Sequence, residues 1–194
     1  MMENIDPNDN IGYWLFYAQR CVAYAFFEVM RLHCLEQEKP YVVTPPQWGV
    51  LALLQGEDGL TIGVISQRRG IDAPTVTGIV KRLEQMELVE RRHDREDRRV
   101  VKVYLTEEGR RIVQSLYPVV MAFNDTMLRD FAESERAHFL AMLQHIIVNL
   151  SDDVLGTGDR FNLLPERAVR QDFVFDDVDR NIAHEDKHLS DKAM

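Results

Sequence analysis

The sequence has few cysteines and no long apolar segment, features on which disulfide-rich and membrane proteins depend. It holds only two cysteines, Cys21 and Cys34, far apart and outside any C-x-x-C pair, which excludes a disulfide scaffold. No apolar run reaches 18 residues, and no basic start leads into an apolar stretch. We therefore expect a protein that does not enter the membrane and that resides in the cytoplasm.

Catalytic and metal-binding patterns are also scarce. No Ser/His/Asp arrangement and no glycine-rich phosphate loop occur, and His33, His138 and His145 form no metal-ligand pattern. The segment 184–188, HEDKH, matches the zinc-protease signature H-E-x-x-H, but only Asp191 follows as a further ligand. We expect no enzyme, no catalytic residue, no metal and no cofactor. A hydrolase built on HEDKH is the weakest alternative.

Positive charge is in short supply, and it is concentrated. The formal net charge is -9, yet residues 68–111 carry twelve of the 23 basic residues against nine acidic ones, a local excess of three positive charges. A basic face on an acidic body attracts a polyanion while the rest of the surface keeps the protein dissolved. Because 45% of the residues are hydrophobic, the chain can also build a packed core.

The first 70 residues predict three helices. Apolar residues recur at steps of three and four over 11–37, which indicates one long helix. Thr44, followed by two prolines, predicts the start of a second helix that ends near Gly56. Leu60 and Thr61 are expected to open a short third helix that stops at Gly70.

A fourth helix is predicted over 73–86, with Asp72 as its N-cap. Its apolar stripe points inward and consists of Val76, Ile79, Val80 and Leu83. The outward face is small, polar and basic, and consists of Thr75, Thr77, Gly78, Lys81 and Arg82. A short helix, a turn and a second helix with such a face are typical of a helix-turn-helix unit.

Residues 89–93 and 100–105 predict two strands joined by the charged connector HDREDRR. A long helix is expected from Thr106 to about Phe131, and a last one over 134–150. The predicted fold class is mainly α with a small β-hairpin wing: a winged helix-turn-helix domain plus a helical dimerisation region.

Residues 74–109, PTVTGIVKRLEQMELVERRHDREDRRVVKVYLTEEG, carry a family resemblance. With this segment, residues 11–150 resemble the MarR family of winged helix-turn-helix transcription regulators. The resemblance implies that Arg99 reaches into a minor groove, whose narrow form attracts arginine, and that Asp97 holds it in place. It also implies a major-groove face made of Thr75, Thr77, Lys81 and Arg82. Arg95 and Arg98 would then be positioning contacts to phosphate.

The resemblance further implies a homodimer bound to a pseudo-palindromic double-stranded DNA operator. The long apolar stripes of the last two helices favour this, since they exceed what a small domain needs for its own core. The expected organisation is an N-terminal dimerisation helix in 1–40, the DNA-binding domain in 41–109, C-terminal dimerisation helices in 110–151 and an acidic tail in 152–194. From Ser151 onward, eleven acidic residues face six basic ones.

Aromatic residues near an arginine suggest a ligand site. Tyr13, Tyr17, Arg20 and Trp48 could line a pocket for a small aromatic acid, since an arginine beside rings suits a ring carboxylate. Packing in a dimer core explains the aromatics equally well. Cys21 is interpreted as a small buried hydrophobe rather than a redox switch.

The functional hypothesis is a homodimeric repressor whose ligand weakens operator binding. Two alternatives remain open. The winged helix could serve protein–protein contact, with acidic residues dominating the electrostatics. Within the same class, the protein could be an activator or an architectural DNA-binding protein.

Overall fold

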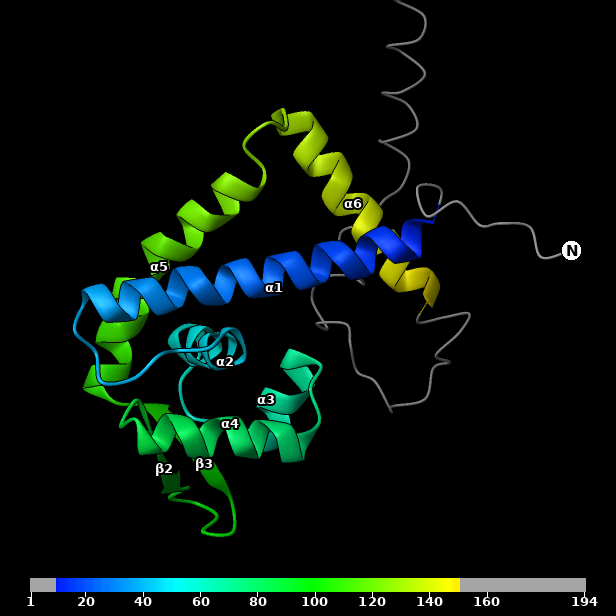
Figure 1. Ribbon diagram of the computed structural model, residues 1–194. Coiled ribbons are helices and arrows are strands. Elements are labelled where there is room, and N and C mark those ends of the chain that lie inside the picture. Colours follow the sequence, from blue (N-terminus) through cyan, green and yellow to red (C-terminus); the bar gives the residue numbers. More distant parts are fainter. Residues whose placement is uncertain (1–9, 151–194) are drawn as a thin grey trace, which may run out of the picture.

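The computed structural model describes residues 10–150 of the chain, and over this range it is mainly helical (Figure 1). The N-terminal and central elements are α1 (Ile11–Glu36), α2 (Pro45–Gly56), β1 (Leu60–Thr61), α3 (Ile62–Arg69) and α4 (Ala73–Gln85). They are followed by β2 (Val89–His93), β3 (Val101–Leu105), α5 (Glu107–Met127) and α6 (Glu133–Leu150). The predicted fold class is confirmed. The acidic tail and its HEDKH segment lie outside the described residues.

Side-chain caps start the helices of the central domain. Thr61 accepts the backbone N–H of Val64 at 3.3 Å, and Thr106 accepts that of Gly109 at 2.9 Å. Each such bond satisfies one of the N–H groups that a helix start leaves without a partner. Gly70 ends α3 in the left-handed conformation, with φ of 58°, which glycine adopts without strain. These local signals explain why the helix starts were readable from the sequence.

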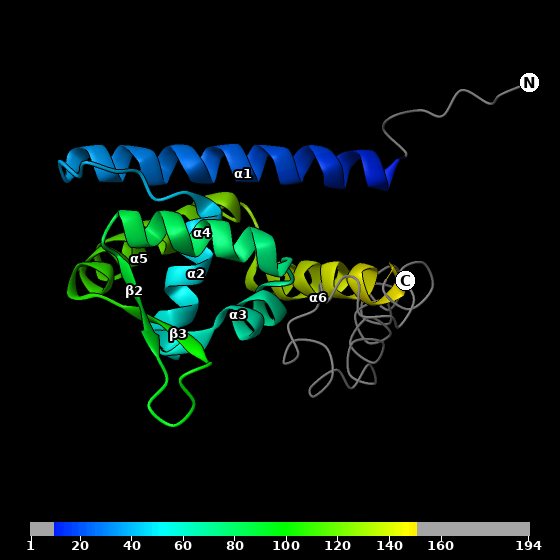
Figure 2. The ribbon, with the colours of Figure 1, turned by 90° about the horizontal axis from the view of Figure 1, so that it is seen from below.

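The hydrophobic core lies among α2, α3, α4, the sheet and the first half of α5. The predicted inward stripe of α4 is confirmed, because Val76, Ile79, Val80 and Leu83 are all buried. Leu88 and Val89 continue this core into the start of β2. Helix α4 and the wing, which is the β2–β3 hairpin, therefore share one packed body, from which the hairpin projects (Figure 2).

The three strands form an antiparallel sheet in the order β1-β3-β2. β2 and β3 pair along their whole lengths, from Val89 opposite Leu105 to His93 opposite Val101. Residues 60–61 form β1, paired with Val103 and Lys102, a strand that was not predicted, and Thr61 also caps the third helix as expected. The prediction missed this strand because only the long-range pairing with β3 makes two residues a strand.

The α5–α6 connection also differs from the prediction. α5 ends at Met127, short of Phe131, and a turn leads into α6. The guanidinium of Arg136 closes this turn by donating to the carbonyl oxygens of Leu128 at 2.9 Å and Phe131 at 3.2 Å. α6 thereby leaves α5 at a sharp angle and runs back toward the N-terminal half of α1 in the view of Figure 1.

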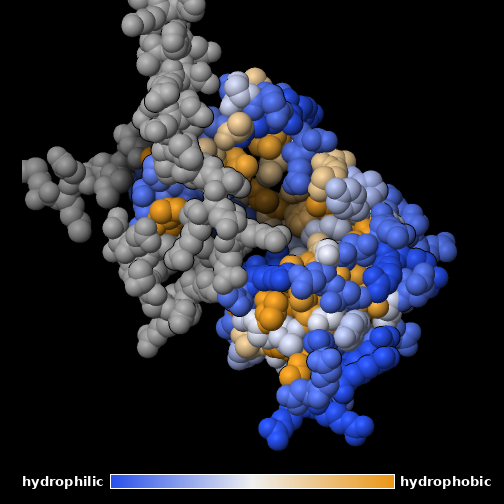
Figure 3. All heavy atoms as spheres, turned by 180° about the vertical axis from the view of Figure 1, so that it is seen from behind, coloured by the Kyte–Doolittle hydropathy of each residue, from blue (hydrophilic) through white to orange (hydrophobic). Residues whose placement is uncertain are grey.

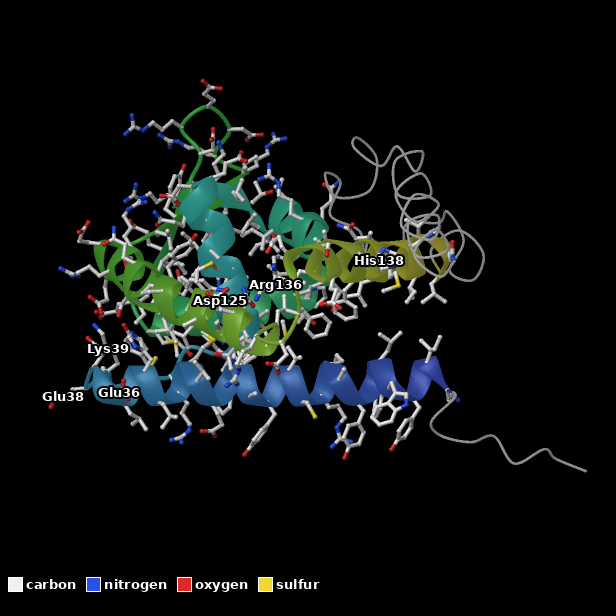
Figure 4. All side chains as sticks on the ribbon, turned by 90° about the horizontal axis from the view of Figure 1, so that it is seen from above. Glu36, Glu38, Lys39, Asp125, Arg136 and His138 are labelled. Carbon is white, nitrogen blue, oxygen red and sulfur yellow. The ribbon has the colours of Figure 1, made fainter. Side chains whose placement is uncertain are left out.

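The two ends of α1 have different surroundings. Its C-terminal part packs on the body, with Met30 and Cys34 buried and Phe26 stacked on Phe123 at 5.1 Å between ring centroids. Its N-terminal half, residues 11–24, is exposed apart from the half-buried Leu15. Figure 4 shows side chains along α1 pointing away from the rest of the molecule as well as toward it. The expectation that Cys21 is buried is wrong for the single chain, in which Cys21 is exposed and Cys34 is buried.

Candidate nucleic-acid interface

The N-terminus of α4 is held by Asp72. Its carboxylate accepts the backbone N–H of Thr75 at 2.9 Å and the Thr75 hydroxyl at 2.6 Å. These two hydrogen bonds hold the pKa of Asp72 below its ordinary value, the hydroxyl contributing most. The first turn of α4 is therefore fixed at the end where a recognition helix meets base edges.

The outward face of α4 is the predicted one. Thr75, Thr77, Lys81 and Arg82 are all exposed. The hydroxyl of Thr77 donates to the carbonyl oxygen of Ala73 at 2.8 Å, as that of Thr75 donates to Asp72. Because both hydroxyl protons are used within the helix, the threonines present methyl groups and oxygen lone pairs to the outside. This face can contact a thymine methyl or accept a hydrogen bond from a base.

Asp94 organises the loop at the end of the wing. Its Oδ1 accepts the backbone N–H groups of Glu96 at 2.8 Å and Asp97 at 3.2 Å, and its Oδ2 pairs with Lys102 Nζ at 2.6 Å. The hydrogen bond from Lys102, followed by the two backbone N–H groups, lowers the pKa of Asp94 to about 2. The carboxylate of Asp94 is thus ionised across the physiological range and keeps the loop folded. Asp94 is not among the site residues predicted from the sequence.

Three basic side chains of the hairpin are held by acidic partners. Arg91 pairs with Glu84 of α4 at 3.4 Å, and Lys102 pairs with Asp94. Arg92 pairs with Glu90 and lies over the ring of Tyr104, with 5.0 Å from the guanidinium carbon to the ring centroid. These residues stabilise the frame of the wing.

The other three arginines of the wing are free. Arg95, Arg98 and Arg99 are exposed, and none of their side chains forms an ion pair or hydrogen bond within residues 10–150. Figure 3 shows the end of the wing as strongly hydrophilic tips that project from the body. The imidazole Nδ1 of His93 lies 2.8 Å from the carbonyl oxygen of Arg98, which fixes the backbone beneath these side chains. Three unpaired guanidinium groups on a fixed loop suit an anionic partner.

Asp97 contacts Arg99 through its backbone. Asp97 Oδ1 accepts the backbone N–H of Arg99 at 2.9 Å, and the Asp97 carbonyl accepts that of Val100. No ion pair joins the two side chains in the described part of the molecule. Asp97 therefore sets the path of the chain at Arg99 and leaves the guanidinium free to contact a ligand.

The residues predicted for a ligand pocket fall into two separate hollows. Tyr17 and Arg20 line an open hollow of about 630 Å³ along α1, and Tyr13 stacks on Tyr17 with 5.8 Å between ring centroids. Trp48 lines a different hollow of about 390 Å³, between α1, α2 and the α3–α4 turn. Within one chain the four predicted residues do not form a single site.

Arg69 is a candidate that the sequence analysis missed. It lines the Trp48 hollow together with Phe26 and Ile71, and its guanidinium lies over Gly49, where a β-carbon would collide with it. No acidic side chain pairs with it among residues 10–150, and desolvation lowers its pKa. From the sequence it was indistinguishable from its neighbour Arg68, which the structure pairs with Glu57 at 2.6 Å.

No helix in the described range combines the length and apolar character needed to cross a membrane. Likewise, no group of three or more His, Cys, Asp or Glu side chains within residues 10–150 is arranged to hold a metal ion.

Comparison with known proteins places the central domain in a family. A sequence profile of the MarR family matches residues 43–100. The chain is 37% identical over 108 residues to YsmB of Bacillus subtilis (strain 168), an uncharacterized HTH-type transcriptional regulator, with 54% of this chain and 74% of that protein covered.

Two solved structures have a similar fold. The transcriptional regulator PcaV of Streptomyces coelicolor, in complex with its natural ligand, superposes with a TM-score of 0.65 and 25% identity, over 77% of this chain and 100% of that chain. The transcriptional repressor CouR, bound to a 23-mer DNA duplex, superposes with a TM-score of 0.65 and 25% identity, over 76% of this chain and 99% of that chain.

Proposed function

This chain belongs to the MarR family of DNA-binding transcription regulators, which are not enzymes, and we propose that it acts as a homodimeric, ligand-responsive repressor on a pseudo-palindromic operator. The observation that carries the DNA-binding part is the set of three unpaired arginines beside the exposed face of α4. A polyanion with grooves suits this arrangement, because the arginines reach phosphate while the helix face reaches base edges.

In the proposed complex, α4 lies in a major groove. Thr75 and Thr77 contact base edges or thymine methyls, and Lys81 and Arg82 reach guanine edges or phosphate. The wing lies along the flanking minor groove. Arg99 enters it at a narrow point, positioned by Asp97 through its backbone. In this arrangement α4 recognises the identity of the bases. The preference of Arg99 for certain DNA sequences arises from the width of the minor groove.

Arg95 and Arg98 sit beside Arg99 on the same fixed loop. They are proposed to neutralise phosphates on either side of the groove, which positions the protein without reading sequence. Their unpaired state supports this assignment, since a guanidinium already held by a carboxylate would have to break that pair first.

The unpartnered apolar surface supports the homodimer. Ile11 is 70% exposed and Phe16 60% exposed on α1, and α6 has no buried residue within the described single chain. Figure 3 shows hydrophobic side chains lining the hollow between α1, α5 and α6. A soluble protein rarely leaves so much contiguous apolar surface in water. A second copy on this surface produces two-fold symmetry and half-sites about 10 bp apart.

The Trp48 hollow supports the proposed ligand response. Phe26 and Trp48 contribute aromatic rings, and Arg69 contributes a desolvated cation with no acidic partner among residues 10–150. This combination suits a small aromatic acid. The hollow joins α1 to Ile71, the residue before the N-cap of α4. A ligand in this hollow would bind with different affinity to conformations that differ in the angle between α1 and α4. It would thereby shift the population of these conformations, and DNA affinity would change with it.

Selection of bound duplexes from a random pool tests the proposal. We expect an inverted repeat with half-sites one helical turn apart, bound with an affinity that falls steeply as salt rises. Recovery of no preferred duplex, or binding that salt leaves unchanged, would favour the protein–protein alternative. A reporter with the selected site between promoter and gene then separates repression from activation.

A further inference from the structure

Asp58, in the turn before β1, continues the wing sheet by means of its side chain. The β1–β3 ladder pairs only Leu60 with Val103 and Thr61 with Lys102. Extending the same register by two residues places Asp58 opposite Leu105, the last residue of β3. At this position Asp58 Oδ1 accepts the backbone N–H of Leu105 at 2.9 Å. A carboxylate oxygen thus occupies the place of a main-chain carbonyl in the ladder.

The backbone itself cannot continue the strand, because it turns away at Gly59. Gly59 has φ of 77°, and a β-carbon there would lie 2.7 Å from the Tyr104 ring. Its N–H points to the Val103 carbonyl at 3.1 Å and to Asp58 Oδ1 at 3.1 Å. The turn therefore brings the Asp58 side chain, and not its carbonyl, against Leu105.

The second oxygen of the same carboxylate reaches α5. Asp58 Oδ2 pairs with Arg110 Nη2 at 2.5 Å, and the Asp58 side chain is only 26% exposed. Asp58 is 47 residues from Leu105 and 52 residues from Arg110 in the sequence. One carboxylate therefore joins the turn after α2, the root of the wing and the first turns of α5.

We propose that Asp58 is a positioning residue for DNA binding: it sets the direction in which the wing projects, and so places Arg99, without touching DNA. This inference rests on the proposed function. Arg99 precedes β3, and at about 3.3 Å per residue it lies roughly 20 Å along the chain from Leu105. A tilt of about 10° at the root then moves the tip by about 3 Å, enough to break a hydrogen bond to DNA.

The wing has a second attachment, which keeps it folded when Asp58 is changed. Thr106 donates its N–H to the Leu88 carbonyl at 3.1 Å and its hydroxyl to the Glu87 carbonyl at 2.6 Å. These bonds hold the end of β3, on the side that faces β2, to the turn after α4. Without Asp58, the opposite side of β3 keeps the two-residue pairing with β1 but loses its connection to α5. The tilt of the hairpin then changes while the β2–β3 ladder stays intact.

The first test replaces Asp58 by asparagine. Asp58→Asn keeps an oxygen that can accept from Leu105 but removes the ion pair with Arg110. It also removes a negative charge, which by electrostatics alone strengthens DNA binding. We expect the reverse, a weakening of operator binding by a factor of about three to ten, part of the loss on removing Arg99. Glu107→Gln removes the same charge from an exposed neighbour of Arg110 and should not weaken binding.

A double-mutant cycle separates positioning from a general structural role. If Asp58 acts through the wing, Asp58→Asn changes affinity less than twofold in an Arg99→Ala background. In a Lys81→Ala background, which alters only α4, Asp58→Asn should weaken operator binding by the same factor as in the wild type. Equal factors in both backgrounds overturn the inference, as does wild-type affinity in Asp58→Asn.

Variants at Arg110 keep the inference testable if Asp58→Asn is unstable in thermal unfolding. Arg110→Gln removes the same ion pair from the α5 side and enters the same cycle, with Arg111→Gln as the matched loss of charge. Arg110→Lys should restore most of the affinity. If wild-type protein binds no selected duplex, the proposed function fails as well. If the wild type binds but neither variant couples to Arg99, only the role of Asp58 is refuted.

Discussion

At the scale of single residues, the six lysine and arginine side chains of positions 91–102 fall into two groups, according to whether a carboxylate pairs with them. Arg91, Arg92 and Lys102 each have a carboxylate partner, whereas the three arginines between them have none among residues 10–150. A guanidinium in an ion pair must lose that partner before it can neutralise phosphate. The unpaired arginines are therefore the ones available to DNA, and the density of positive charge alone would not separate the two groups.

Replacing Arg99 by alanine should reduce operator affinity by about 1–3 kcal/mol at matched salt and lower the salt slope by about one. The Arg99 guanidinium has no partner among residues 10–150, so the fold should be unaffected. Binding titrations at several salt concentrations measure both quantities. Arg129→Ala, an exposed arginine at the end of α5, is the control for loss of charge. Wild-type affinity in Arg99→Ala would refute its proposed role in the groove.

The ionisation of Asp94 leads to a prediction about how the stability of the wing depends on pH. Its pKa is lowered to about 2, so its contribution to wing stability is complete above the ordinary value of 3.8 and is lost as pH falls toward 2. At pH 3 the carboxyl group should still be about 90% ionised, against about 15% for an ordinary aspartate. An NMR titration of the Asp94 carboxyl carbon measures this. Lys102→Met should move the midpoint upward, and a wild-type midpoint near 3.8 would contradict the assignment.

At the scale of elements, the wing and α4 depend on the turn between α2 and β1. Gly59 adopts a positive φ there and lies against Tyr104, whose ring in turn lies beneath Arg92. The conformation of this turn decides where Asp58 meets β3. The short strand β1 is therefore the link between the helix-turn-helix unit and the wing.

Gly59→Ala should lower the free energy of unfolding by about 1–3 kcal/mol, because the new methyl group meets both a strained φ and the Tyr104 ring. Gly56→Ala provides the matched control. Gly56 ends α2, nothing lies within 4 Å of an added β-carbon, and alanine there should leave stability unchanged or raise it by up to about 1 kcal/mol. Urea unfolding of the two variants compares them directly. Equal effects would exclude a special role of the turn.

At the scale of the whole molecule, the first half of α1 and the outer helix α6 bury no side chain fully within residues 10–150. The N-terminal half of α1 and all of α6 expose large apolar side chains within the described range, while the central domain is well packed. Burial of such surface in a dimer yields roughly 25 cal/mol for each Å² removed from water. This exposed apolar surface of residues 10–150 is the observation that supports the proposed homodimer.

Leu140 on α6 tests this conclusion. It is 57% exposed in the single chain, so Leu140→Lys should cost the monomer little and the dimer much. We expect sedimentation to show a dimer for the wild type and a shift toward monomer for the variant. Operator affinity should fall with it, because two half-sites need two recognition helices. Ser134→Lys adds the same charge at a polar position of α6 and should leave the dimer intact.

Local signals determined most of the secondary structure. The cap at Asp72, the left-handed Gly70 and the apolar stripe of α4 each act within a few residues, so the sequence predicted these boundaries closely. The exposed face of α4 follows from the same periodicity, whereas the sequence predicted the two strands of the hairpin without their register. The family resemblance added roles for Asp97 and Arg99, and their contacts to DNA remain predictions.

Tertiary structure decided everything that depends on residues far apart in the chain. It formed β1 from two residues and placed Asp58 against Leu105 and Arg110. Within the described range it also paired Arg68 with Glu57 and left Arg69 without an acidic partner. It also separated Trp48 from Tyr17 and Arg20, and exposed Cys21. The physical reason is that the periodicity of the sequence determines which face of a helix or strand a residue occupies. Which residue it contacts on that face is determined by the packing of other elements.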